Sequence, residues 1–240
     1  MLLCLDYDGT LAEIVADRTK AQPYPGINET LRRLSQRSET LRLAIVTGRR
    51  IAEVRALLGG VSGLLYSGVH GLELDGDDLV KGRRPRGFEY AEELAMVRRW
   101  LAKNVNHERG FAVEDKEVAL ALHYRLASSS EAASLCGRLE KFVAESLAQL
   151  KVMHLKMVME VLPTIASKWH AVVELRRQVN QNSAVTYIGD DETDEDVFVR
   201  MDGMDFGVVV GFDRPSFARY RLDSPAMVAD ELHSLANAIA

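Results

Sequence analysis

Short apolar runs alternate with amphipathic stretches through the first seventy residues. The runs predict buried strands, and the spacing of Ile27, Leu31 and Leu34 after a Pro-Gly pair predicts a helix. Strand, helix and strand in alternation are typical of parallel crossover units in a doubly wound sheet. The predicted strands cover residues 2–5, 41–46 and 64–67, and the predicted helices cover 26–38 and 51–58.

The pattern changes over residues 77–162. Strands joined by short turns and backed by helices indicate an α+β insert with an antiparallel sheet. The helices are expected over 88–103 and 130–149, and the strands over 111–116, 118–124 and 152–161.

The first pattern returns at about Pro163. A helix is expected from Ser167, strands over 184–188 and 206–210, and helices over 194–200 and 226–240. The chain is therefore predicted to be an α/β protein. Its Rossmann-like core of parallel strands would comprise residues 1–76 and 163–240, and residues 77–162 would form an inserted α/β cap domain.

Composition narrows the class of protein. The 240 residues are 47% hydrophobic, enough for a sizeable core, and the net charge of −5 disfavours a nucleic-acid partner. The basic stretch 81–86 lies beside the acidic run 75–78 and is interpreted as a solvated loop. Neither a signal peptide nor a membrane-length apolar run is visible, so a cytoplasmic location without a membrane partner is expected. A monomer is the expected state, although no sequence feature specifies it.

Acidic and polar residues follow several of the predicted strands. Asp6 and Asp8 follow the first, Thr47 the second, and the acidic run from Asp190 follows the strand over 184–188. The carboxyl ends of strands in an open sheet meet at one crevice, and Lys168 at a helix start would point into it. So many carboxylates would repel one another without a cation, and hard oxygen ligands favour Mg²⁺. A carboxylate nucleophile, a neighbouring acid/base and Mg²⁺ would explain the set.

Each of these residues also has a purely structural interpretation. Asp6 to Gly9 would form a turn, Thr47 would cap a helix, and Lys168 would be a surface lysine. The run from Asp190 to Asp196 would be the acidic first turn of a helix. The occurrence of all four segments in one chain favours a functional site.

The ordered set resembles the haloacid dehalogenase superfamily of phosphohydrolases. Asp6-Tyr7-Asp8-Gly9-Thr10 is similar to its first motif, Thr47 to the second, Lys168 to the third and Gly189-Asp190-Asp191-Glu192-Thr193-Asp194 to the fourth. The resemblance implies that Asp6 attacks phosphorus and ligates Mg²⁺. It implies that Asp8 is the acid/base and that its carbonyl faces Mg²⁺.

The same resemblance assigns the remaining motif residues. Thr47 and Lys168 would hold phosphate oxygens, helped by backbone N–H groups near Gly9 and Thr10. Asp190 would bind Mg²⁺ directly, whereas Asp191 and Asp194 would lie around the ion or orient Lys168.

Further motifs are similar to the trehalose-6-phosphate phosphatase family. They are Thr47-Gly48-Arg49, Gly68-Val69-His70-Gly71, Val113-Glu114-Asp115-Lys116, His123-Tyr124-Arg125, the pair Lys156 and Glu160, and the run Gly189 to Asp196. The resemblance implies a cap of the C2 type, inserted between the second and third motifs. It also implies a sugar-phosphate substrate and a functional link to a trehalose-phosphate synthase.

Within the cap, the resemblance implies that Glu114 with Lys116 and Lys156 with Glu160 bind glucose hydroxyls. In extended strands each pair would share a face, and the alternative for each is a simple ion pair. Substrate contacts are also expected near Gly48 and Arg49, by the phosphate or the closed cap. His70 would touch substrate or fill a turn, and Arg125 would be a ligand or part of a salt bridge.

Two departures from the family pattern bear on the substrate. Trp169 follows Lys168 where the family usually has glycine, and Val161-Leu162 precedes Pro163 where a basic residue is common. Phosphatases of sucrose 6-phosphate, glucosylglycerol phosphate or mannosyl-3-phosphoglycerate therefore remain alternatives. A phosphotransferase and a non-catalytic sensor are also open, although intact Asp6 and Asp8 argue against the sensor.

Overall fold

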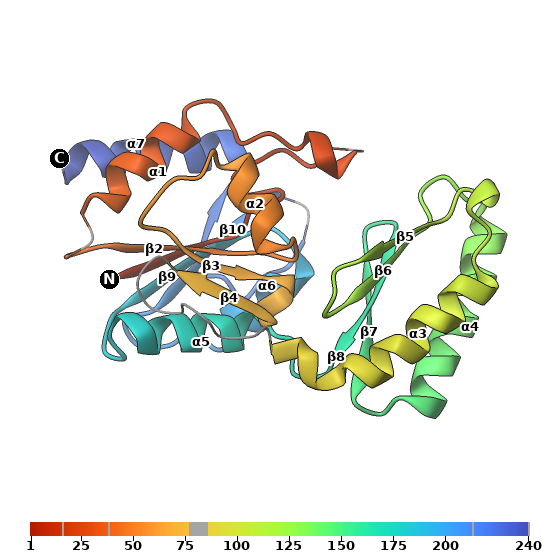
Figure 1. The fold of residues 1–240 in the computed structure, drawn as a ribbon. Helices are drawn as coiled ribbons and strands as arrows, with labels where there is room; N and C mark the ends of the chain where they lie inside the picture. Colours follow the sequence, from red (N-terminus) through yellow and green to blue (C-terminus); the bar gives the residue numbers. More distant parts are fainter. Residues whose placement is uncertain (16, 38, 77–85, 213, 240) are drawn as a thin grey trace. The chain divides into compact units, whose positions relative to one another are not determined.

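The computed structural model describes residues 1–240 except 16, 38, 77–85, 213 and 240. The chain divides into two compact units (Figure 1): Met1–Arg83 together with Ser167–Ala240, and Arg84–Ala166. The predicted boundary at 76/77 borders the segment 77–85, which lies outside the described residues. Residues 81–85 of the basic stretch lie within that segment. The assignment of the second unit as a cap stays a prediction.

The first unit is built on a seven-stranded sheet in the order β11-β10-β9-β1-β2-β3-β4. Neighbouring strands are parallel except β3 and β4, which are antiparallel. The strands are β1 (Leu2–Leu5), β2 (Arg42–Val46), β3 (Leu65–Gly68), β4 (Glu73–Gly76), β9 (Val185–Gly189), β10 (Phe206–Val210) and β11 (Tyr220–Leu222).

Helices cover both faces of this sheet (Figure 1). Leu3 and Leu5 of β1 lie in the core cluster with residues of α1, α2 and α7, whereas Leu2 and Cys4 lie in the cluster with residues of α5 and α6. The helices are α1 (Ile27–Ser35), α2 (Ile51–Leu57), α5 (Lys168–Val179), α6 (Glu192–Phe198) and α7 (Pro225–Ala238). Alternate residues of a strand point to opposite faces, so an all-apolar β1 is what a sheet covered on both sides requires. The predicted doubly wound α/β fold is confirmed.

The position of β1 decides where the polar loops meet. It pairs in parallel with β2 on one side and β9 on the other. The residues that follow these three strands therefore emerge at the same edge of the sheet, side by side.

The second unit is a four-stranded antiparallel sheet in the order β5-β6-β8-β7, packed against two helices. Its elements are α3 (Ala91–Asn104), β5 (Ala112–Asp115), β6 (Leu120–His123), α4 (Ser129–Ser146), β7 (Leu150–Leu155) and β8 (Val158–Pro163). Leu120 and Leu122 of β6 and Met159 and Val161 of β8 share a core cluster with α3 and α4. The predicted antiparallel sheet backed by helices is thus confirmed.

The single strand predicted over 152–161 is wrong. The segment forms two antiparallel strands, β7 and β8, with Lys156 and Met157 at the turn between them. Met157 takes up a positive φ of 63°, a conformation that favours glycine or asparagine, so the sequence carries no turn signal there. The strands β4 and β11 were also not predicted. Across the described part of the chain, every helix is too short or too polar to span a bilayer.

Candidate active site

Asp6 lies directly after β1, at the centre of the sheet edge. Its backbone N–H donates to the Ile188 carbonyl of β9 at 2.9 Å, which holds the loop against the neighbouring strand. Its side chain is buried, and Oδ1 lies 3.2 Å from the ammonium Nζ of Lys168. A carboxylate in this position is desolvated and paired with one cation.

Lys168 is the first residue of α5, and its side chain is only 3% exposed, so the surface-lysine interpretation is wrong. Ser167 caps this helix by accepting from the His170 N–H at 3.1 Å. The Lys168 ammonium reaches Asp194 Oδ1 at 2.7 Å as well as Asp6. Trp169, the departure from the family pattern, is partly buried and packs against the core cluster that contains residues of α5 and β9.

Asp194 is completely buried and uses both carboxylate oxygens. Oδ1 accepts from Lys168 and from the Tyr187 hydroxyl at 2.6 Å, and Oδ2 accepts from the Asp191 N–H at 2.9 Å in a capping box of α6. The acidic run does start a helix, as the structural interpretation expected. The buried contacts of Asp194 add an orienting role toward Lys168.

Asp6, Asp190 and Asp194 each offer an oxygen within 4.8 Å of the others. Asp190 Oδ1 is buried and has no hydrogen-bond partner among the residues that the structure describes. Since the oxygens of Asp194 are engaged, Asp6 and Asp190 are the carboxylates with capacity for a cation. Hard oxygen donors with an unsatisfied buried lone pair fit a divalent metal ion.

The electrostatics of this cluster point the same way. Burial, reinforced by Asp194, raises the pKa of Asp190 to about 8, and burial with the neighbouring acids raises the pKa of Asp6 well above its usual value. Burial alone would lower the pKa of Lys168, but Asp194 and Asp6 outweigh it and raise that pKa. With all of its carboxyl groups ionised, the cluster would carry more negative charge than one lysine neutralises.

These pKa values predict how the metal-free protein responds to pH. Asp190 and Asp6 hold protons in the folded state that they lose when unfolded, so the free energy of unfolding falls as pH rises from about 4 to about 8. A divalent cation would replace the protons and flatten this slope. Denaturant unfolding at several pH values, with EDTA and with Mg²⁺, measures both. Equal slopes in EDTA and Mg²⁺ would contradict a metal site.

Gly9, in the loop after β1, lies directly against the Asp190 side chain. It has a φ of +76°, and a Cβ built on it would lie 2.0 Å from Asp190 Oδ2. Gly26 has a similar φ of +86° with nothing within 4 Å of the corresponding Cβ.

These two glycines form a matched pair. We expect Gly26→Ala to cost only the left-handed strain, about 1 kcal/mol of unfolding free energy. Gly9→Ala should cost more and also weaken Mg²⁺ binding, measured by calorimetry, about tenfold or more because Asp190 must move. Equal metal affinity in the two variants would show that Gly9 does not shape the metal site.

The Asp8 carboxylate lies outside the group formed by Asp6, Asp190 and Asp194. It accepts from Arg49 through both oxygens, from Nε and Nη2, each at 2.7 Å. Arg49 was expected near the phosphate or the closed cap, and that expectation stays a prediction. In the structure its N–H groups are directed to Asp8, to Glu53 and, at 2.8 Å, to the Arg18 carbonyl.

Backbone hydrogen bonds tie the loop after β2, which contains Thr47, to the segment after β3, which contains His70. The Thr47 hydroxyl is buried and accepts from the Arg49 N–H at 3.1 Å; the N-cap of α2 is Arg50, so Thr47 does not cap that helix. His70 is buried, donates its N–H to the Thr47 carbonyl and accepts from the Ser167 N–H. A Cβ on Gly48 would lie 2.7 Å from the His70 ring, so His70 fills the space beside Gly48.

The N–H groups near Gly9 and Thr10 are used by the turn itself. Gly9 donates to the Ala12 carbonyl at 2.8 Å and Thr10 to the Tyr7 carbonyl at 3.3 Å. The Thr10 hydroxyl is buried, and nothing in the described chain hydrogen-bonds to it. The hydroxyl is therefore the better candidate at this position for binding a ligand.

In the second unit, Lys116 and Glu114 have partners on other strands rather than each other. Lys116 lies just beyond β5 and forms an ion pair with Glu160 of β8, with both side chains at most 2% exposed. Glu114 instead hydrogen-bonds His123 Nε2 at 2.9 Å. The expectation that Lys156 and Glu160 share a face of one strand is wrong, because Lys156 lies in the β7–β8 turn.

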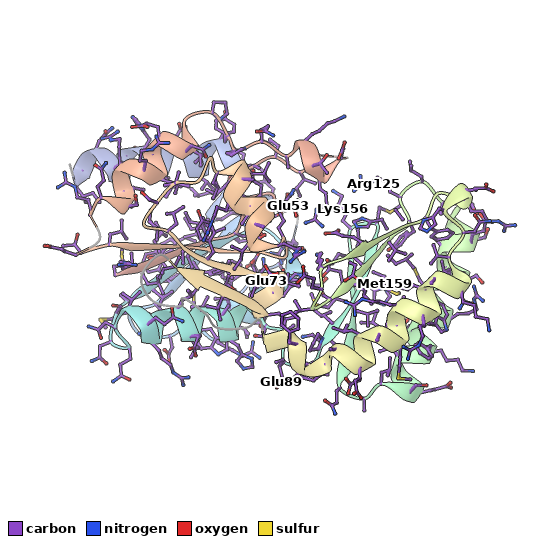
Figure 2. The ribbon with its side chains drawn as sticks, in the orientation of Figure 1. Glu53, Glu73, Glu89, Arg125, Lys156 and Met159 are labelled. Carbon is purple, nitrogen blue, oxygen red and sulfur yellow. The ribbon has the colours of Figure 1, made fainter. Side chains whose placement is uncertain are left out.

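Lys156 and Arg125 lie at one end of the second sheet, both exposed (Figure 2). The Tyr124 N–H donates to the Met157 carbonyl at 3.2 Å, which ties the segment after β6 to the β7–β8 turn. The second unit thus presents two cations at the same end of its sheet.

The sequence analysis did not identify two residues of the first unit that contact the site, Tyr187 and Arg214. Tyr187 lies in an apolar strand, where only the need of a buried hydroxyl for a partner hints at its bond to Asp194. Arg214 donates to the Asp190 carbonyl at 3.1 Å, the Asp191 carbonyl at 2.7 Å and Glu195 Oε1 at 2.7 Å. No sequence signal marked Arg214, which braces the loop carrying Asp190.

The sequence of this chain matches one family of known proteins. The family model described as Trehalose-phosphatase matches residues 4–226. A trehalose-phosphate phosphatase of Mycobacterium avium is 32% identical over 97% of this chain, and a trehalose 6-phosphate phosphatase of Zea mays is 30% identical over 99%. The chain spans 61% of the length of the first of these relatives and 70% of the second.

Solved structures that are similar to this chain include proteins of the same family. The trehalose-6-phosphate phosphatase of Aspergillus fumigatus is 28% identical, with a TM-score of 0.67 over 99% of this chain and 93% of that one. The C-terminal domain of the Candida albicans trehalose-6-phosphate phosphatase, at 24% identity, shares the fold with a TM-score of 0.79 over 98% and 91% of the two chains. This chain therefore belongs to the trehalose-phosphatase family.

Proposed function

We propose that this protein is a Mg²⁺-dependent phosphatase that hydrolyses trehalose 6-phosphate to trehalose and phosphate. The observation that carries the proposal is the buried cluster in which Lys168 bridges Asp6 and Asp194 beside Asp190. Membership of the family supports the choice of substrate. A functional link to a trehalose-phosphate synthase, which would supply the substrate, and a cytoplasmic location belong to the same proposal.

The reaction would run in two half-reactions. An oxygen of Asp6 attacks phosphorus, the bond from phosphorus to the sugar oxygen breaks, and that oxygen takes a proton from Asp8. Water then attacks the aspartyl-phosphate and gives its proton to Asp8, and the bond from phosphorus to Asp6 breaks. Phosphate leaves and both carboxyl groups return to their starting states.

The other residues would hold the phosphoryl group and the cation. Lys168 lies close enough to Asp6 to neutralise phosphate oxygens, and the buried hydroxyls of Thr47 and Thr10 are candidate donors. Asp6 and Asp190 would hold Mg²⁺, while Asp194 and Asp191 keep Lys168 and the loop in place. Bound Mg²⁺ would supply charge neutralisation at the phosphoryl oxygens.

Residues of the second unit would bind the sugar. The candidates are Glu114, Lys116, Arg125, Lys156 and Glu160. Charged groups make strong hydrogen bonds to hydroxyls. In the strand register, Glu114 and Glu160 lie in one row on either side of Ala121.

The experiment that tests this function is phosphate release with Mg²⁺ from a panel of esters. The panel contains trehalose 6-phosphate, sucrose 6-phosphate, glucosylglycerol phosphate, mannosyl-3-phosphoglycerate and glucose 6-phosphate. We expect kcat/KM for trehalose 6-phosphate to exceed the others about a hundredfold, roughly 2.7 kcal/mol of transition-state discrimination. A different best substrate would replace the sugar and keep the chemistry, and no release from any ester would reject the proposal.

Glu160→Gln tests the sugar ligands with little change of volume. It removes a charge that pairs with buried Lys116, so both the stability of the variant and its substrate specificity are measured. We expect kcat/KM for trehalose 6-phosphate to fall about tenfold or more while that for p-nitrophenyl phosphate changes less than about threefold. Equal losses on both esters would assign the Lys116–Glu160 pair to folding alone, and thermal unfolding of the variant provides the control.

A further inference from the structure

Arg49 is more completely buried than its place in a loop would suggest. Its side chain is 1% exposed, and the guanidinium lies 5.2 Å from the centroid of the Tyr7 ring. Tyr7 is in turn fixed by its hydroxyl, which donates to the Ala21 carbonyl at 2.7 Å. A planar guanidinium stacked on an anchored ring and bonded on its other sides has one orientation.

That orientation is imposed on Asp8. Nε and Nη2 of Arg49 each donate to a different oxygen of the Asp8 carboxylate at 2.7 Å, the bidentate arrangement that fixes both the position and the plane of a carboxylate. Nη1 of Arg49 donates to Glu53, and Nη2 donates to the Arg18 carbonyl as well as to Asp8, so all three guanidinium nitrogens are held. The Asp8 side chain itself is 39% exposed, so packing alone would not define its direction.

We propose that Arg49 is a positioning residue for Asp8. Its buried guanidinium sets the direction in which the Asp8 carboxylate gives and takes protons, and it does so without touching the substrate phosphate. The inference rests on the proposed function in that Asp8 is taken as the acid/base. It departs from the expectation that Arg49 itself binds the phosphate or the substrate.

A double-mutant cycle separates positioning from direct contact. We expect Arg49→Lys, which keeps the charge and loses the fork, to lower kcat on trehalose 6-phosphate about tenfold or more with KM within about threefold of wild type. In an Asp8→Asn background, the same change should lower kcat less than about twofold, since nothing remains to be positioned. Losses that multiply in the double variant, or a KM that rises with little change of kcat, would overturn the proposal.

Arg176→Lys is the matched control. Arg176 also donates to a buried carboxylate, Asp205, at 2.6 Å in the first unit. Asp205 lies at the start of β9, where it accepts from the Val185 N–H, whereas Asp6 lies near the other end of that strand. We expect this variant to show a similar change in thermal stability and wild-type kcat. A loss of kcat in this variant equal to that in Arg49→Lys would indicate a general effect of weakening the core and would overturn the positioning role.

Crystal structures of the wild type and the Arg49→Lys variant test the inference without turnover. We expect the Asp8 carboxylate to have one conformer in the wild type and to be turned or split between conformers in the variant. An unchanged Asp8 would overturn the proposal. If the wild type releases phosphate from no ester, the proposed function fails, while this comparison still decides whether Arg49 positions Asp8. If Arg49→Lys does not fold, Arg49→Gln takes its place in both experiments.

Discussion

Asp6→Asn abolishes turnover and leaves substrate binding intact: this is the expected result with the largest effect. The substitution keeps the size of the side chain and removes the negative oxygen that attacks phosphorus, so kcat should fall by about 10⁴-fold or more. Lys168 lies 3.2 Å from Asp6 Oδ1 and stays available to hold the phosphate. Binding of trehalose 6-phosphate, measured by calorimetry with Mg²⁺, should therefore persist.

Asp8→Asn is the control for Asp6→Asn. It leaves the nucleophile in place and removes the group that would activate water, so an aryl phosphate with a good leaving group should label the protein and the label should persist. Acid-quenched, ³²P-labelled protein measures this directly. Label in Asp6→Asn, or turnover of that variant near the wild-type rate, would remove Asp6 from the role of nucleophile.

Lys168→Met should damage both activity and stability. The variant leaves the completely buried Asp194 and the buried Asp6 without their shared cation, and breaking a buried pair in this way costs about 3–5 kcal/mol. The loss of a charge aimed at the phosphoryl oxygens should lower kcat about a hundredfold or more. Denaturant unfolding and phosphate release measure the two effects.

The sign of the pH dependence distinguishes this explanation from a loss of packing. Lys168 lowers the pKa of Asp6 in the wild type, so without Lys168 the protonated form of Asp6 is favoured further and the stability gap to wild type in EDTA should narrow as pH falls toward 5. Lys20→Met is the control, since Lys20 is mostly exposed and its replacement should change stability by less than about 0.5 kcal/mol. A gap that is constant with pH would mean that Lys168 serves only to fill space.

The central part of the fold was predictable because its strands are bounded by clear signals. β1, β2 and β9 are apolar runs that end at aspartate, threonine or glycine, and strands of this kind can only be buried between helices. The β7–β8 hairpin was not predictable, because apolar residues continue up to a turn that Met157 makes with a positive φ. Asp6, Asp8, Thr47 and Asp190 were identified for the same reason as the strands, since they follow strand ends, whereas Lys168 begins a helix.

The partners of those motif residues were not predictable. Arg49 and Asp8 are 41 residues apart, and their contact depends on how two loops leave adjacent strands. Lys116 and Glu160 are 44 residues apart in the sequence. They meet because β6 pairs with both β5 and β8 and so brings these two strands into one sheet. Spacing along one strand favoured the local pairs Glu114–Lys116 and Lys156–Glu160, but pairing across strands outweighed it.

The place of β1 between β2 and β9 has a consequence for biosynthesis. Leu2 of β1 pairs with Val185 of β9, so β1 lacks one of its two neighbours until 183 further residues have been synthesised. The second unit is one continuous segment, Arg84–Ala166, and all its strands and helices have been synthesised before β9 is made. Asp190 and Asp194 follow β9, so every element of the second unit is present in the nascent chain before the site for phosphate chemistry can be complete.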